Sequence, residues 1–245
     1  MQTGENEKMN RTIKLGIVAM AFSAAVAGSA RATETVASEG PEGWTPVAIG
    51  LATPVQLPWG LNRWDVYGLD VNLFYSDAPK MYGLDVGGFA AVTRDDMIGL
   101  QVAGLFNLGC KDVYGIRATL GLNMCAGAVY GADIGLIGFR DTLKGLDVHF
   151  LGAASRNVCG LQVSGLANIT AVESYGCTVA GLANVAKTAY GLQLAIVYNM
   201  TQELHGCQIA FVNFADYCPN GFQIGLVNII MSNKVKVLPF VNGYF

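Results

Sequence analysis

The chain has 245 residues, of which 52% are hydrophobic and only 13% are charged. Its formal net charge is −3 and its isoelectric point is near 5.3, so the composition lacks the basic surface expected for a nucleic-acid partner. High hydrophobicity excludes a disordered chain, and soluble domains usually carry about 25% charged residues. The composition therefore indicates a very large core, or an outer surface that faces something other than water.

The first 32 residues have the layout of a secretory signal peptide. Arg11 and Lys14 precede an apolar run from Leu15 to Gly28, which is too short to span a bilayer comfortably. Ala30-Arg31-Ala32 then supplies a cleavage site of the A-x-A form, so we expect cleavage after Ala32. The signal predicts an exported bacterial protein of the outer membrane or cell surface.

A lead-in segment, residues 33–65, separates the signal from a repeat domain, residues 66–245. The repeat shows as glycines that begin about eleven successive units at intervals of 14 to 16 residues. These glycines are Gly68, Gly83, Gly99, Gly115, Gly131, Gly145, Gly160, Gly176, Gly191, Gly206 and Gly221.

Within each unit, apolar residues alternate with small or polar ones. In the unit at Gly191 the apolar positions are Tyr190, Leu192, Leu194 and Ile196. Alternation with a period of two predicts a β-strand with two chemically different faces, and no part of residues 66–230 shows helical spacing. Five or six turn-like residues follow each strand, as at 76–80 and 93–96.

Asparagine recurs seven or eight residues after the glycine in most units. It does so at Asn107, Asn123, Asn168, Asn184, Asn199, Asn213 and Asn228. Asparagine suits the turn that follows a strand, and it equally suits a ladder of stacked side chains. Both interpretations stay open at the level of sequence.

Three of these units resemble a bacterial family of surface-repeat proteins with tandem GLQ-φ-G-L-φ-N units, known from spirochaetes and Bacteroidetes. The units are Gly99–Asn107, Gly160–Asn168 and Gly221–Asn228, and the closing segment Val237–Phe245 resembles the family's end. The resemblance covers residues 66–245. It implies export and surface association, and it implies no catalytic residue.

Two architectures fit the alternation. The first, which we favour from sequence, is an antiparallel up-and-down β-barrel of about 12 strands in an outer membrane, with Val235–Phe245 as its last strand. Nine residues span about 30 Å, and a tilted strand of this length matches an apolar band of about 25 Å. Its partner would be membrane lipid, and the residues expected to line its lumen are Asp70, Asp85, Arg117, Asp133 and Asp147.

The alternative is a parallel β-solenoid with coils of about 15 residues, surface-displayed or secreted as a binding or structural module. If nine residues of a coil ran straight, the remaining residues would be too few to return to the start of the coil. Such a coil therefore has to bend within its strand. The expected sites of the bend are Gly104, Gly121, Gly165 and Gly225. In this architecture successive turns stack, so Cys110 and Cys125 could form a disulfide. In an up-and-down barrel they would lie at opposite ends.

The sequence offers no constellation for catalysis or for a cofactor. His149 and His205 are isolated from one another, and no cysteine belongs to a CxxC pair, so neither a zinc site nor a catalytic group is expected. We therefore expect a structural or pore-forming envelope protein, or the solenoid module, rather than an enzyme.

Overall fold

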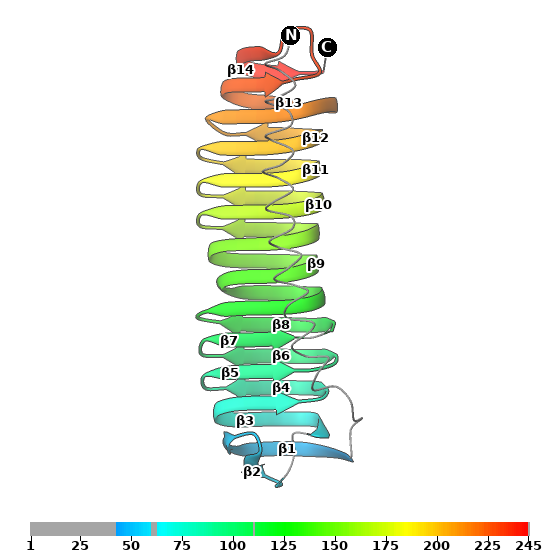
Figure 1. Cartoon of the computed structure of the whole chain (residues 1–245), viewed down its shortest axis with the longest axis vertical. Coiled ribbons are helices and arrows are strands. Elements are labelled where there is room, and N and C mark those ends of the chain that lie inside the picture. Colours follow the sequence, from blue (N-terminus) through cyan, green and yellow to red (C-terminus); the bar gives the residue numbers. More distant parts are fainter. Residues whose placement is uncertain (1–42, 60–62, 110, 245) are drawn as a thin grey trace, which may run out of the picture.

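The computed structural model describes residues 43–59, 63–109 and 111–244, and these form one continuous sheet of fourteen strands wound into a column of stacked coils (Figure 1). The strands are β1 (Gly43–Ala52), β2 (Val55–Leu57), β3 (Trp64–Ala78), β4 (Met81–Gly87), β5 (Ala90–Thr93), β6 (Met97–Ala103), β7 (Phe106–Gly109), β8 (Val113–Thr119), β9 (Leu122–Ser164), β10 (Ala167–Ala180), β11 (Ala183–Ala195), β12 (Tyr198–Ile209), β13 (Val212–Ile230) and β14 (Val237–Gly243). No helix in these ranges has the length and apolar character needed to cross a bilayer.

Equivalent positions of successive units lie side by side in the sheet. Gly68 pairs with Gly83, Gly83 with Gly99, and Gly99 with Gly115, in parallel and without a shift of register. Among the described strands the pairings are parallel except at the two ends, where β2 and β14 are antiparallel to their neighbours. The fold is therefore a parallel β-solenoid.

The antiparallel barrel favoured from sequence is wrong, whereas the all-β repeat and the alternative architecture are confirmed. The error has a physical reason, because inward and outward side chains alternate in both architectures. The assumption of a straight nine-residue strand also failed. β6 ends at Ala103 and β7 begins at Phe106, so the chain bends at Gly104, and bends also occur at Gly121 and Gly165. Gly225, by contrast, lies inside β13.

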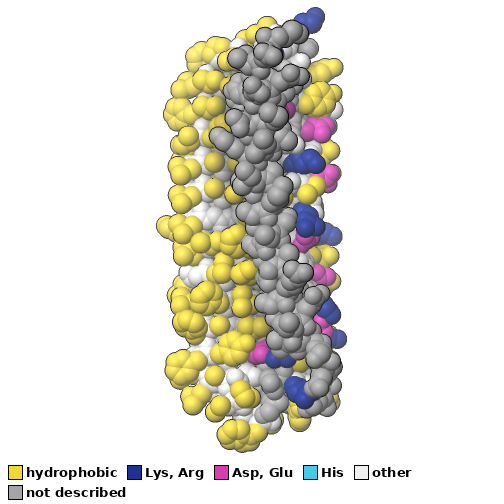
Figure 2. All heavy atoms as spheres, viewed as in Figure 1, with side chains coloured by type: hydrophobic (Ala, Val, Ile, Leu, Met, Phe, Trp, Pro, Cys, Tyr) yellow, Lys and Arg dark blue, Asp and Glu magenta, His cyan; other side chains and the backbone are white. Residues whose placement is uncertain are grey.

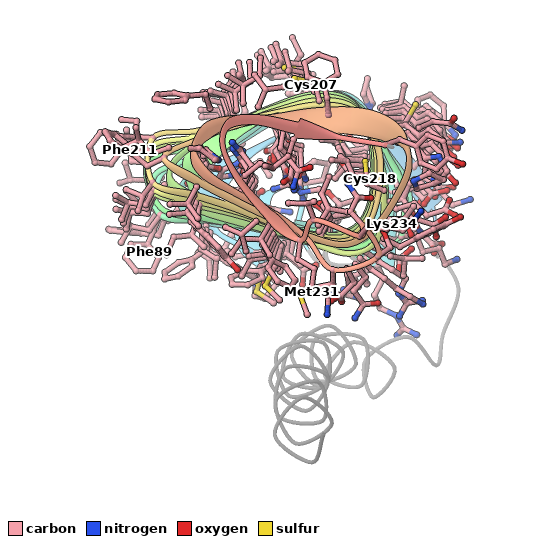
Figure 3. All side chains as sticks on the ribbon, turned by 90° about the horizontal axis from the view of Figure 1, so that it is seen from above. Phe89, Cys207, Phe211, Cys218, Met231 and Lys234 are labelled. Carbon is pink, nitrogen blue, oxygen red and sulfur yellow. The ribbon has the colours of Figure 1, made fainter. Side chains whose placement is uncertain are left out.

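Each coil has two flat walls and two corners, which are clear in the coil that contains Gly176. We call Ser174–Ala180 the glycine wall, Gly181–Leu182 the apolar corner, Ala183–Ala186 the asparagine wall and Lys187–Thr188 the charged corner, and we use these names for the equivalent residues of every coil. Seen along the axis, Phe89 and Phe211 project from the apolar corner, Cys207 projects from the glycine wall, and nitrogen and oxygen tips crowd the opposite corner (Figure 3).

The unit glycine is required by the stacking of the glycine walls. Ten of the eleven unit glycines have φ between 117° and 147°, a backbone region that L-residues with a side chain rarely adopt. A Cβ atom placed on Gly83 would lie 2.0 Å from the carbonyl oxygen of Gly68 in the preceding coil. Since coils stack about 4.8 Å apart, no side chain fits there, which explains the glycine period.

The apolar part of the interior lies beside the charged corner. It is a column of side chains two residues before each unit glycine, including Val66, Met81, Met97, Val113 and Val129, each at most 1% exposed. A second cluster around Leu204 and Ile230 continues this column in the last coils. The rest of the interior is polar, and this polar part contains every residue that the sequence analysis assigned to a lumen.

Both ends of the column are closed by antiparallel strands. β14 pairs with β13 at one end, and β2 pairs with β1 at the other. Near β14, the Asn233 amide donates to the Asn242 side chain and to the Gly243 carbonyl oxygen. Such caps cover the open edges that would otherwise pair with another chain.

Candidate functional site

The polar interior is the candidate site, because it gathers the titratable side chains that the sequence singled out. Its first component is the asparagine column on the asparagine wall. The Asn168 amide donates to Asn184, Asn184 donates to Asn199, and Asn199 donates to Asn213, with nitrogen–oxygen distances of 3.0 to 3.1 Å. The same bonds join Asn107 to Asn123, and Asn213 to Asn228. Of the two interpretations left open by the sequence, the ladder is confirmed.

Each asparagine also binds the backbone of the following coil across the interior. The Asn168 amide donates to the Val179 carbonyl oxygen at 2.8 Å, and the Asn184 amide to that of Leu194 at 2.6 Å. These carbonyl groups lie near the bend at the apolar corner, where the sheet ladder is interrupted. The ladder therefore satisfies buried backbone acceptors that regular strand pairing leaves open.

Glutamines form a second column two residues after the unit glycine. The Gln223 amide donates to Gln208 at 2.8 Å, and the Gln208 amide donates to Gln193 at 2.9 Å. All three side chains are at most 2% exposed. Amide groups suit such a column because each one both donates and accepts, so identical neighbours satisfy one another.

In the middle of the chain, inside β9, other residues replace the amides of both columns. The asparagine position is taken by Gly138 and, in the next coil, by Ala153, which pairs with Asn168. A Cβ atom on Gly138 would lie 1.8 Å from Nη2 of Arg140 and 2.5 Å from Nε2 of His149. The small residues therefore leave the room that two large polar side chains occupy.

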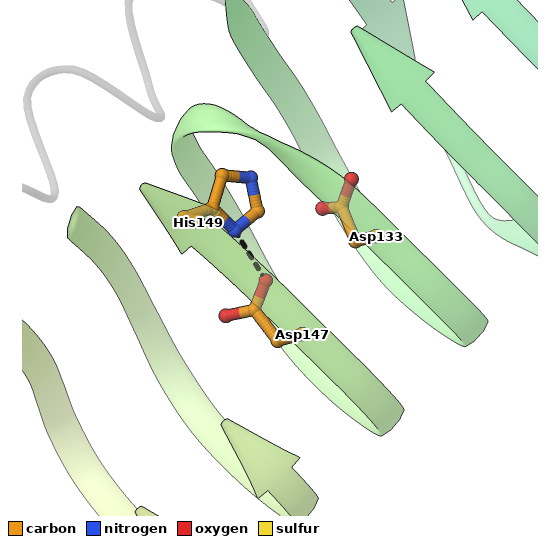
Figure 4. A group of neighbouring side chains, drawn as sticks. All are labelled: Asp133, Asp147 and His149. Carbon is orange, nitrogen blue, oxygen red and sulfur yellow. Dashed lines mark ion pairs between the residues drawn. The ribbon is translucent and has the colours of Figure 1, made fainter. Parts of the chain in front are cut away.

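These two side chains belong to a buried network of ion pairs. Arg117 Nη2 lies 2.9 Å from Asp133 Oδ2, and Arg140 Nε lies 3.2 Å from the same oxygen. Arg140 Nη1 and His149 Nδ1 each lie 2.5 Å from Asp147 Oδ1, and the His149 contact is drawn in Figure 4. All five side chains are at most 1% exposed. Two arginines thus face two aspartates in this cluster.

The pKa of the Asp147 carboxyl shows how strongly the cluster is coupled. Burial alone would raise this pKa, but the Arg140 charge and the His149 contact outweigh burial and lower the pKa to about 2. For Arg140 the directions are reversed. Burial alone would lower its pKa, but the charges of Asp147 and Asp133 outweigh burial and raise the pKa. Asp147 and Arg140 are therefore both charged inside the protein at ordinary pH.

Asp133, Asp147 and His149 are also the one group in the described residues whose ligand atoms, all within 4.8 Å of one another, could hold a metal ion. Arg140 argues against that use, because its guanidinium contacts both carboxylates and keeps its charge in proteins. A cation would have to displace Arg140 inside a closed coil. The arrangement fits an ion-pair network better than a metal centre.

Asp70 in β3 and Asp85 in β4 form a different kind of pair, in the first coils of the repeat. They occupy the glutamine column in adjacent coils, directly opposite each other, and the ion pairs found among the described residues give neither of them an arginine. Burial, followed by the Asp85 charge, raises the pKa of Asp70 to about 8. Burial also raises the pKa of Asp85 to about 6, although Ser76 and Gln101 donate to its carboxylate at 2.5 and 2.9 Å.

The five residues assigned from sequence to a lumen thus all lie inside the coils, but in two separate groups. Asp70 and Asp85 form one group, and Arg117, Asp133 and Asp147 form the other. The interior they share is filled by neighbouring side chains. Sequence reasoning missed Arg140, although the missing asparagine in its unit was a usable signal that this coil is packed differently.

The remaining predicted positions lie outside these groups. His205 occupies the tyrosine position of its unit, where its ring stacks on Tyr190 with centroids 4.5 Å apart and its Nε2 lies 2.9 Å from Glu203. Cys110 lies outside the described residues, so its disulfide with Cys125 stays a prediction. Cys125 is buried, and its sulfur lies 3.0 Å from the Lys111 carbonyl oxygen.

The fold and the filled interior together define the class of protein, a capped parallel β-solenoid with internal amide and ion-pair columns. Comparisons of the chain with protein-family models, with curated proteins and with solved structures give no match. The resemblance to surface-repeat proteins therefore stays a prediction, and function has to be argued from the structure itself.

The asparagine ladder predicts a large effect for Asn184→Ala. The substitution removes donors to Leu194 and Asn199 and leaves buried groups without partners, so we expect the free energy of unfolding to fall by about 2–4 kcal/mol. Urea unfolding followed by circular dichroism measures this. The control is Asn220→Ala at an exposed position, which should change stability by less than about 0.5 kcal/mol. Equal effects of the two substitutions would contradict the ladder.

The ion-pair network predicts that Arg140→Met destabilises the protein by about 3–5 kcal/mol, because it leaves buried carboxylates uncompensated. Adding Asp147→Asn restores the balance of charge and should recover at least half of the loss. Arg156→Met, which removes a half-exposed partner of Asp141, should cost no more than about 1 kcal/mol. A double variant that is no more stable than Arg140→Met alone would show that charge balance is not what matters.

The isolated aspartate pair predicts a pH effect of definite sign. The folded protein binds the Asp70 proton more tightly than the unfolded chain does, so Asp70 contributes most stability below about pH 4 and loses it as pH rises toward 8. Asp70→Asn should remove this loss. Its unfolding midpoint should match that of the unsubstituted protein at low pH and exceed it at high pH. The control is Asp96→Asn, at the charged corner. An Asp70→Asn protein whose unfolding midpoint at high pH falls below that of the unsubstituted protein would contradict the prediction.

Proposed function

We propose that this chain is an exported module of the bacterial cell envelope, a surface-displayed β-solenoid that acts by binding or by building structure rather than by catalysis. Support for export comes from the residues before the repeat, where Arg11, Lys14 and the apolar run that follows precede an A-x-A site. The resemblance of the GLQ units to surface-repeat proteins points to the same location.

The observation that carries the proposal is that the polar groups which could do chemistry are buried, so that only the outer surface is open to partners. The titratable side chains of the ion-pair network and of the Asp70–Asp85 pair are at most 2% exposed. Each is held by neighbours in its own or the adjacent coil, as are Arg117 by Asp133 and Asp85 by Gln101. A dissolved substrate has no contact with these groups, so partners meet only the outer surface.

That outer surface is unusually apolar for a protein. Columns of Leu, Val and Ile face outward along the glycine wall, as at Leu100, Ile116, Leu161 and Ile224, each at least 37% exposed. Extended apolar surface of this kind marks a binding face rather than a solvated one. Amides and ion pairs thus fill the polar part of the interior, whereas the glycine wall and the apolar corner present hydrocarbon to the outside.

The proposal is tested by producing the full-length chain in a Gram-negative host and separating cytosol, periplasm and membranes. We expect a product whose first residue is Thr33 and which is found in the envelope fraction. Ala30→Gln with Ala32→Gln should block processing, and Ala25→Gln, within the apolar run, controls for the change in composition. An unprocessed chain that stays in the cytosol would refute export.

A further inference from the structure

We propose that the solenoid lies along a lipid bilayer with its axis in the membrane plane, its apolar corner among the acyl chains and its charged corner in water. This inference rests on the proposed envelope function and names its partner, a lipid surface. It differs from the barrel expected from sequence, because the chain would lie on the bilayer and not cross it. Three features of the outer surface support it.

The first feature is the confinement of charge to one corner. The described residues include 11 basic and 13 acidic side chains, and burial of Arg117, Arg140 and five aspartates leaves nine basic and eight acidic ones (11 − 2 and 13 − 5). These follow one flank of the column, while hydrophobic side chains follow the other along its full length (Figure 2). Pairs such as Arg94–Asp77 and Lys111–Asp95 bridge neighbouring coils there.

The second feature is the apolar corner itself, a ridge of hydrocarbon opposite the charges. Its side chains are between 42% and 82% exposed, and they include Phe89, Leu105, Leu120, Phe150, Leu182 and Phe211. Exposing large apolar side chains to water at this density costs free energy that burial in acyl chains would recover.

The third feature is a column of aromatic residues between the two corners. Six units carry tyrosine directly before the glycine, at Tyr67, Tyr82, Tyr114, Tyr130, Tyr175 and Tyr190. Their rings stack in pairs, with centroids 4.5 to 4.7 Å apart. Lys144 takes this position in one unit and lies 5.0 Å from the Tyr130 ring centroid.

This column gives the surface a graded polarity around each coil. From the charged corner the order is tyrosine, then an aliphatic column that includes Leu161 and Leu192, then the apolar corner. Tyrosine is enriched where membrane meets water, because its ring is apolar and its hydroxyl is polar. Lysine stems can likewise lie along apolar surface while the ammonium reaches water.

A lipid surface suits this geometry better than a second copy of the chain does. Protein interfaces have an apolar centre inside a polar rim, but here exposed hydrocarbon covers the glycine wall and the apolar corner beside it. That corner is convex, and a bilayer adapts to a ridge where a second copy would need a matching groove. Backbone pairing along the axis leaves few polar groups unsatisfied on the lipid side.

The test is flotation of the purified processed chain, which begins at Thr33, with phosphatidylcholine vesicles. Because the outer charges nearly balance, we expect binding to neutral lipid that changes less than about twofold when salt is raised from about 0.1 M to about 1 M. Phe89→Asp with Phe150→Asp should weaken partitioning at least about tenfold. The matched control, Lys187→Asp with Lys234→Asp at exposed positions outside the ridge, should bind like the original protein.

Orientation is tested with brominated acyl chains, which quench nearby indole fluorescence. A tryptophan introduced by Leu120→Trp on the ridge should be quenched, and one introduced by Lys187→Trp at the charged corner should not. Failure to float, or equal quenching at the two positions, would overturn the lipid assignment. Self-association without lipid that Phe150→Asp abolishes would identify a second copy as the partner instead. A processed envelope protein that does not float would leave the proposed function standing.

Discussion

The structure depends on one constraint, the in-register stacking of identical positions about 4.8 Å apart. The unit glycines impose it, since a Cβ atom on Gly99 would lie 2.0 Å from the Gly83 carbonyl oxygen. Every other residue of a unit is then placed against its own counterpart in the next coil. A side chain is stable at a position only if it tolerates a copy of itself, or if its neighbour is changed to complement it.

This constraint explains the choice of residues in each column. Amides satisfy a copy of themselves, so Gln208 and Gln223 continue one another, and tyrosine rings such as Tyr175 and Tyr190 stack nearly parallel at 1°. Carboxylates do not tolerate a copy: in the stacked pair, burial, followed by the Asp85 charge, raises the pKa of Asp70 to about 8. The central coils solve the same problem by placing Arg117 opposite Asp133.

Much of this was accessible from sequence, because stacking leaves a period in the residues. The units, the two faces of the strands and the bends at Gly104 and Gly121 could be predicted. The direction of pairing could not, since barrels and solenoids share the alternation of inward and outward side chains. The missing asparagine marked the Arg140 coil as different, but only the structure shows that the Arg140 guanidinium fills the space beside Gly138.

The same constraint determines how side chains are distributed over the outer surface. Once each column repeats along the axis, a single apolar position becomes a stripe as long as the molecule, and so does a charged one. A globular protein can scatter exposed leucines singly, whereas a solenoid amplifies each choice about eleven-fold. Selection for solubility alone would fill such stripes with polar residues. Hydrocarbon at Leu120 and Phe150, with charge kept at the opposite corner, is consistent with a surface shaped by contact with lipid.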